Sequence, residues 1–141
     1  MDPGTSSTNP GVSSLEFLPW WRLVGFLLVV AVLLGSLLPT ADVPSVPFSD
    51  KLQHAGAYGL LMYWFASISR QRSHIFAALL LLALGIAIEF LQRATGYRDF
   101  EVADMVADGI GVLSGWLIAW TPAGRILPAV DLRLAGWMGR S

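Results

Sequence analysis

The sequence has no cysteine among its 141 residues. Without thiols the chain can form no disulfide framework, no zinc–thiolate site and no thiol nucleophile. Its two histidines, His54 and His74, cannot by themselves make a histidine-rich metal cage. Charged residues are also scarce, at 13%, and the net charge of -1 lacks the basic excess that nucleic-acid binding needs. We therefore expect no nucleic-acid partner.

Apolar residues, in contrast, are more abundant than an ordinary soluble domain needs. They make up 55% of the chain, and the mean hydropathy is +0.60. Apolar runs cover about residues 20–38, 52–68, 74–91 and 102–121. Each corresponds to about 25–30 Å of helix, close to the thickness of the hydrocarbon layer, and short connections make neighbouring helices antiparallel. The sequence predicts an all-α membrane protein with four transmembrane helices in one domain, residues 17–121.

The two ends of the chain differ from this domain. Residues 1–16 have little to bury, so we expect a disordered tail, of which residues 1–14 are either native or a cloning remnant. A cleaved signal peptide ending near Pro39-Thr40-Ala41 is less favoured, because the preceding region is long and holds only one basic residue. Residues 122–141 alternate apolar side chains with arginines and predict an amphipathic helix on the membrane surface, although Pro128 weakens it.

Basic residues are distributed unequally between the two ends of the predicted helices. One end has six basic residues: Arg22, Arg70, Arg72, Arg125, Arg133 and Arg140. The other has three: Lys51, Arg93 and Arg98. The positive-inside rule therefore places both termini in the cytoplasm. Seven of the ten acidic residues then lie at the outer end: Asp42, Asp50, Glu89, Asp99, Glu101, Asp104 and Asp108.

Several of these polar residues interrupt the apolar segments themselves. Asp104 and Asp108 are four residues apart and share a helix face, as do His54 and Tyr58. A charge facing lipid at the helix centre costs about 2.5–3.5 kcal/mol, so we expect these faces to turn toward one another. They predict a polar pocket at the outer end. Its predicted ligand-binding residues are Asp50, Lys51, His54, Tyr58, Glu89, Gln92, Arg98, Asp104 and Asp108.

Each pocket residue also has a purely structural interpretation. Asp104 can be a first-turn acid favoured by the helix dipole, and Asp108 a helix-to-helix hydrogen-bonding group. Glu89 can pair with Arg93 or Arg98 as a plain salt bridge. Asp50 and Lys51 can be an N-cap followed by an ordinary interfacial lysine, and His54 a hydrogen-bonded interfacial histidine. Gly111-x-x-x-Gly115 predicts close helix packing, either within the chain or in a homo-oligomer.

The same residues resemble the signature of the VanZ-like membrane proteins over roughly residues 20–120. The matching pieces are Asp50-Lys51-x-x-His54-x-x-x-Tyr58, Glu89-x-x-Gln92, Arg98 and Asp104-x-x-x-Asp108-x-x-Gly111. Asp108 stands where many relatives have asparagine, which adds a negative charge. The resemblance implies a small multi-pass protein of the bacterial inner membrane, in a family associated with low-level teicoplanin resistance and without a settled biochemical activity.

Three hypotheses follow for the pocket. It binds or modifies an amphiphilic envelope ligand, such as a lipid-linked wall precursor, a phospholipid head group or a lipoglycopeptide. It is an intramembrane enzyme acting on a lipid-linked phosphate, with His54, Glu89 and Asp108 as candidate catalytic residues. Carboxylates there can hold Mg²⁺ or Ca²⁺, whereas zinc is less natural with so few nitrogen ligands, and the sequence requires no cofactor. In the third hypothesis the pocket residues are structural and only hold the helices together. A proton relay is disfavoured, because no ionisable residue continues through the fourth segment.

Overall fold

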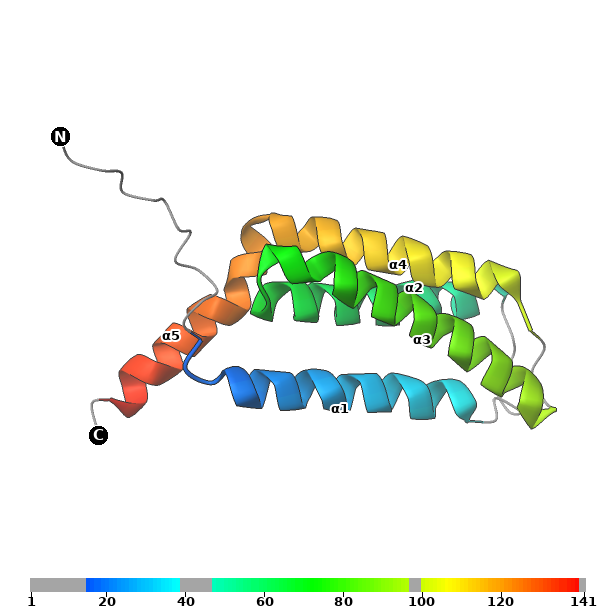
Figure 1. The fold of residues 1–141 in the computed structure, drawn as a ribbon, viewed down its shortest axis with the longest axis horizontal. Helices are drawn as coiled ribbons and strands as arrows, with labels where there is room; N and C mark the ends of the chain where they lie inside the picture. The colour runs from blue at the N-terminus through cyan, green and yellow to red at the C-terminus, as the bar shows by residue number, and fades with distance from the viewer. Residues whose placement is uncertain (1–14, 39–46, 97–99, 140–141) are drawn as a thin grey trace.

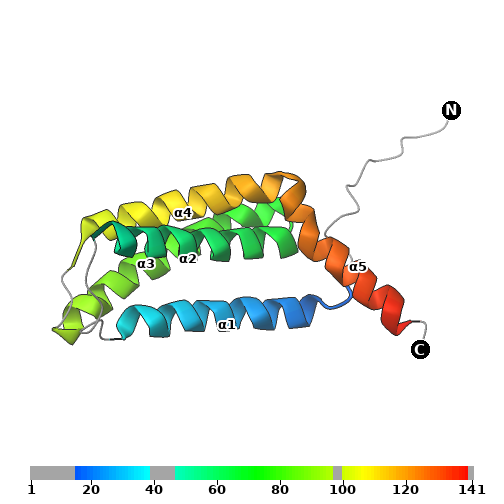
Figure 2. The ribbon, with the colours of Figure 1, turned by 180° about the vertical axis from the view of Figure 1, so that it is seen from behind.

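The computed structural model describes residues 15–38, 47–96 and 100–139, and all regular elements in these ranges are helical. The long helices are α1 (Leu18–Leu37), α2 (Pro47–Ile68), α3 (His74–Thr95) and α4 (Val102–Trp120), followed by the shorter α5 (Ile126–Met138). Two 3₁₀ turns, η1 (Gln71–Ser73) and η2 (Pro122–Arg125), precede α3 and α5. Figures 1 and 2 show α1 to α4 running lengthwise beside one another, with α5 turned away at one end. The all-α fold class is confirmed.

Three stretches of helix are long and apolar enough to cross a membrane: Leu18–Leu37, Gln71–Thr95 and Val102–Trp120. α2 is as long as α3 but opens with the polar residues Asp50, Lys51, Gln53 and His54. The composition of α2 alone therefore does not identify it as a membrane-spanning helix. The length and apolar composition of the other three helices are those of a membrane protein.

The helix boundaries follow local stop and start signals. α2 begins at Pro47, five residues before the expected start, because proline suits the first turn of a helix, where its missing N–H is not needed. Asp50 and Lys51 therefore lie on α2 itself. α3 continues to Thr95 and ends at Gly96, whose φ of 77° is the left-handed conformation that glycine adopts without strain.

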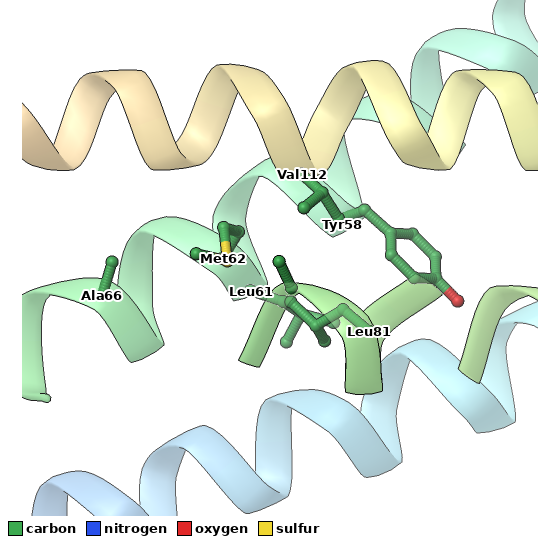
Figure 3. Packing of buried hydrophobic residues seen from close by; sticks show 7 residues of the cluster. Tyr58, Leu61, Met62, Ala66, Leu81 and Val112 are labelled. Carbon is green, nitrogen blue, oxygen red and sulfur yellow. The ribbon is translucent and has the colours of Figure 1, made fainter. Parts of the chain in front are cut away.

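The core gathers around α2. Tyr58, Leu61 and Met62 of α2 are almost completely buried, and they pack with Leu81 of α3 and Val112 of α4 (Figure 3). Most other large apolar side chains lie on the outside of the bundle, as expected where the surrounding solvent is lipid. α2 is thus the central helix: it contacts each of the other helices, although one face with Leu52 and Leu60 remains exposed.

Glycines allow α2 and α4 to approach very closely. A Cβ atom on Gly115 would lie 2.9 Å from the carbonyl carbon of Gly59 and 3.0 Å from the backbone nitrogen of Tyr63. A Cβ on Gly111 would similarly lie 3.0 Å from the carbonyl carbon of Ala55. The predicted packing role of Gly111 and Gly115 is confirmed within the chain, and it brings the polar faces of α2 and α4 together.

The C-terminal helix is anchored to the start of α1 by a buried carboxylate. Asp131 accepts hydrogen bonds from the backbone N–H groups of Glu16 (2.8 Å) and Phe17 (3.0 Å) and from the indole N–H of Trp21 (2.7 Å). It thereby binds the backbone of the two residues that directly precede α1, together with one side chain of its first turn. Pro128 does not break α5, because it lies in the first turn.

Gly115→Ala should destabilise the bundle, because the added methyl group meets backbone atoms of α2 that cannot move independently. We expect the free energy of unfolding in detergent to fall by about 1–3 kcal/mol. Gly109→Ala is the matched control, since the nearest atom to a Cβ there is 4.0 Å away. The control should be neutral or stabilising by up to about 1 kcal/mol. Equal melting temperatures for the two variants would contradict the close crossing.

Asp131→Ala should loosen the start of α1. The change removes the acceptor of three hydrogen bonds, and one hydrogen bond to a charged group contributes about 1.5–3 kcal/mol. We therefore expect the free energy of unfolding to fall by at least this amount. Glu16→Gln is the control, because the Glu16 side chain is exposed and only its backbone N–H reaches Asp131. Melting of Asp131→Ala at the wild-type temperature would show that the anchor adds no net stability.

Candidate functional site

Ionisable side chains meet where α2 and α4 begin and α3 ends, which we call the polar end. There Lys51 of α2 donates to Asp104 Oδ1 at 2.9 Å and to Glu101 Oε2 at 2.7 Å. The Asp104 side chain is 4% exposed, whereas that of Glu101 is 51% exposed. Lys51 therefore links a buried carboxylate to one at the surface.

A buried histidine–aspartate pair lies one turn deeper. His54 Nδ1 is 2.9 Å from Asp108 Oδ1, and both side chains are buried. An ionised Asp108 can only accept, so Nδ1 carries the hydrogen and Nε2 is directed elsewhere. Nε2 lies 3.9 Å from Asp104 Oδ2, which is the Asp104 oxygen that Lys51 does not contact. The pair fixes the orientation of the imidazole ring between two carboxylates of α4.

Three buried oxygen atoms beneath this pair lack hydrogen-bond partners within the described part of the chain. They are Tyr58 Oη, Glu89 Oε1 and Asp108 Oδ2, one from each of α2, α3 and α4. Gly85 of α3 makes room for two of them: a Cβ there would collide with the Asp108 carboxylate and lie 3.3 Å from Tyr58 Oη. An unpaired buried polar group costs about 1–3 kcal/mol. The cluster thus leaves one polar oxygen of each of three helices unsatisfied.

The remaining oxygen of Glu89 and the side chain of Gln92 hold α3 in place. Glu89 Oε2 accepts from the backbone N–H of Glu101 at 3.0 Å, at the start of α4. Gln92 donates to the carbonyl oxygen of Ser36 at 2.9 Å and so ties α3 to the end of α1. Among the ion pairs of the described residues none joins Glu89 to Arg93. Arg98 lies outside the described residues.

One group of side chains has the spacing of a metal site. Asp50, His54 and Asp104 each place one potential ligand atom within 4.8 Å of the others. His54 contributes to it while Asp108 holds its other ring nitrogen, the arrangement in which a carboxylate orients a metal-binding histidine. An ion bound at about 2.0–2.2 Å from each atom would draw the three slightly together.

Sequence reasoning identified most of this cluster but missed two of its parts. Gly85 stands within a run of leucine and alanine and looks there like a neutral spacer, yet its missing side chain makes room for Asp108. The sequence places Glu101 among the outer acids but not in the pocket, although its backbone binds Glu89 and its side chain binds Lys51. Its place directly before the fourth apolar run was the available signal.

Comparison with known proteins gives a family. The family model described as VanZ/LLP1 matches residues 9–126. An uncharacterized protein of the yeast Schizosaccharomyces pombe is 31% identical over 87 residues, which are 59% of this chain and 54% of that protein. The chain thus matches about half the length of this curated relative. No solved structure matches it. Because the family model covers most of the sequence, as the resemblance of residues 20–120 predicts, the chain belongs to the VanZ/LLP1 family.

Proposed function

We propose that α1 to α4 all cross the membrane, that both termini are cytoplasmic, and that the polar end binds the head group of an amphiphilic envelope molecule at the outer leaflet. The basic residues at the opposite end support this orientation through the positive-inside rule. α2 crosses as the central helix, because its polar first turns face α4 rather than lipid. The proposal places the protein in the bacterial inner membrane as a multi-pass protein.

The three unpaired oxygens of Tyr58, Glu89 and Asp108 carry this proposal. A cluster that only locked helices together would satisfy its polar atoms internally, because unpaired groups in a membrane interior are costly. Other polar groups of the cluster are satisfied within the protein: Lys51 donates to Asp104, and Gln92 donates to the Ser36 carbonyl oxygen. One oxygen of Glu89 accepts from the Glu101 backbone. The oxygens left over are available for a ligand group.

The chemistry of these three oxygens restricts which groups the ligand can present to the site. Two carboxylate oxygens accept hydrogen bonds, and Lys51, the one described cation of the predicted pocket apart from His54, is already paired with Asp104 and Glu101. The site therefore suits an amine or hydroxyl group better than a phosphate. Amine-bearing phospholipid heads, sugars of lipid-linked precursors and lipoglycopeptides such as teicoplanin all offer such donors. A relative in a eukaryote favours a head group found in membranes generally.

Glu89→Gln and Asp108→Asn should each weaken ligand binding while leaving the protein folded. Losing one hydrogen bond to a charged group corresponds to roughly a 10- to 100-fold loss of affinity. We would compare teicoplanin susceptibility of cells expressing wild type, His54→Ala, Glu89→Gln or Asp108→Asn at matched membrane abundance, and binding of teicoplanin and phosphatidylethanolamine to each purified protein. Exposed Arg93→Gln is the control and should behave as wild type.

Two results would contradict the proposal. Equal susceptibility together with equal binding in all variants would remove the outer-leaflet site. A fall in abundance and melting temperature that accounts for every lost effect would leave the cluster as a helix lock.

A metal-assisted enzyme acting on a lipid-linked phosphate is the second candidate, favoured by the spacing of Asp50, His54 and Asp104. One imidazole and two carboxylates suit Mn²⁺ or Zn²⁺ at least as well as Mg²⁺, because imidazole prefers the transition metals. A bound ion would polarise a phosphoryl oxygen. In this function Asp108 orients His54 rather than touching substrate.

Chelator-treated protein should be stabilised by adding the ion back. At an ion concentration 100 times the dissociation constant the gain is about 2.7 kcal/mol, which raises the melting temperature by several degrees. Mn²⁺, Zn²⁺ and Mg²⁺ would be titrated separately by thermal unfolding. His54→Ala and Asp50→Asn should lose the shift, and Asp131→Asn, at the other end of the bundle, should keep it. No shift with any ion in the wild type would exclude this candidate.

A further inference from the structure

A second site lies at the end of the bundle opposite the polar end. Figures 1 and 2 show the C-terminal ends of α1 and α3 close together and their N-terminal ends apart. The Gln92–Ser36 hydrogen bond holds the closed side of this wedge. On its open side a cavity of about 930 Å³ lies between α1, the end of α2 and the start of α3. This volume is at the upper end of the range for small-molecule sites, about 300–1,000 Å³.

The depth of the cavity is apolar. On α3 it is lined by Phe76, Leu80 and Leu84, which are spaced by four residues and share one helix face. Val29 of α1 and Phe65 of α2 form facing walls. The lining of α3 spans about 12 Å along the helix, enough to accept a length of hydrocarbon chain rather than a compact polar molecule.

The mouth of the cavity is basic. Arg22 of α1, Arg70 after α2 and Arg72 of η1 all line it, and all three side chains are exposed. None of them forms a salt bridge with a described residue. The N-terminus of α3 opens at the same place, with no side-chain cap at Ser73, and its dipole also favours a negative group. Three cations that pair with no acid of the described residues, beside an apolar cleft, suit an anionic head attached to an apolar tail.

We propose that this cleft binds an anionic phospholipid, with an acyl chain between α1 and α3 and its phosphate at Arg22, Arg70 and Arg72. A soluble anion would leave the apolar depth without a role, and a zwitterionic lipid would not match three unpaired cations. The site is separate from the polar end and does not depend on the function proposed there. In the proposed orientation it faces the cytoplasmic leaflet, whose anionic lipids attract basic residues at the membrane surface.

Lipid binding to the purified, delipidated full chain tests this assignment. Native mass spectrometry in detergent would titrate phosphatidylglycerol and phosphatidylcholine with identical acyl chains, and glycerol phosphate as the head group alone. The wild type should prefer phosphatidylglycerol and should not retain glycerol phosphate. In the double variant Arg70→Gln/Arg72→Gln, affinity for phosphatidylglycerol should fall about fivefold for each arginine, or about 25-fold in all. Phosphatidylcholine binding should not change.

The matched control is Arg125→Gln/Arg133→Gln, which removes two basic residues that do not line the cleft. It should retain wild-type preference. An equal loss in this control would show non-specific attraction to a basic surface, and equal binding of the two lipids by the wild type would overturn the charge argument. Ala77→Phe fills the cleft without changing charge and should also weaken phosphatidylglycerol binding. Unchanged binding in this variant, while folded, would place the lipid elsewhere.

Asp108→Asn separates this inference from the proposed function. The variant changes the polar end only, so it should bind phosphatidylglycerol like the wild type. A parallel loss there would show that the cleft is not an independent site.

Discussion

The close crossing of α2 and α4 is the constraint on which the polar end depends. Gly59, Gly111 and Gly115 remove side chains where the two backbones meet, and only at this separation can His54 reach Asp108 and Lys51 reach Asp104. The glycines contribute no chemistry of their own. They determine which polar groups face each other, and therefore which are satisfied inside the bundle and which are left for something else.

Much of this arrangement follows from helical periodicity. Spacings of three and four residues correctly put His54 with Tyr58, and Asp104 with Asp108, on single faces, and the cost of exposing charge to lipid turned those faces inward. Periodicity says which face a residue shares, but not which neighbour that face meets. Gln92 shares a face with Glu89 yet binds α1, and Lys51, predicted to bind a ligand, is paired within the protein.

Other features depended on contacts between distant segments, which no local pattern encodes. Asp131 lies in a stretch that predicts an amphipathic surface helix, where an acid is unremarkable, and only the fold places it over the start of α1. Gly85 is similar, because its role depends on Asp108 from another helix. The wedge between α1 and α3 also escapes prediction, since the central parts of both helices are apolar and carry no sign of where the two separate.

The Asp131 anchor also bears on the order in which the protein assembles. Its carboxylate and the Glu16 N–H that it accepts from are 115 residues apart in the chain. While the polypeptide is being synthesised, α1 therefore emerges before Asp131 exists, and the N–H groups of Glu16 and Phe17 gain this acceptor only once α5 has been made. The helices that α1 contacts along its length, α2 and α3, are made before α5, so the tie to Asp131 is the last contact that the start of α1 can acquire.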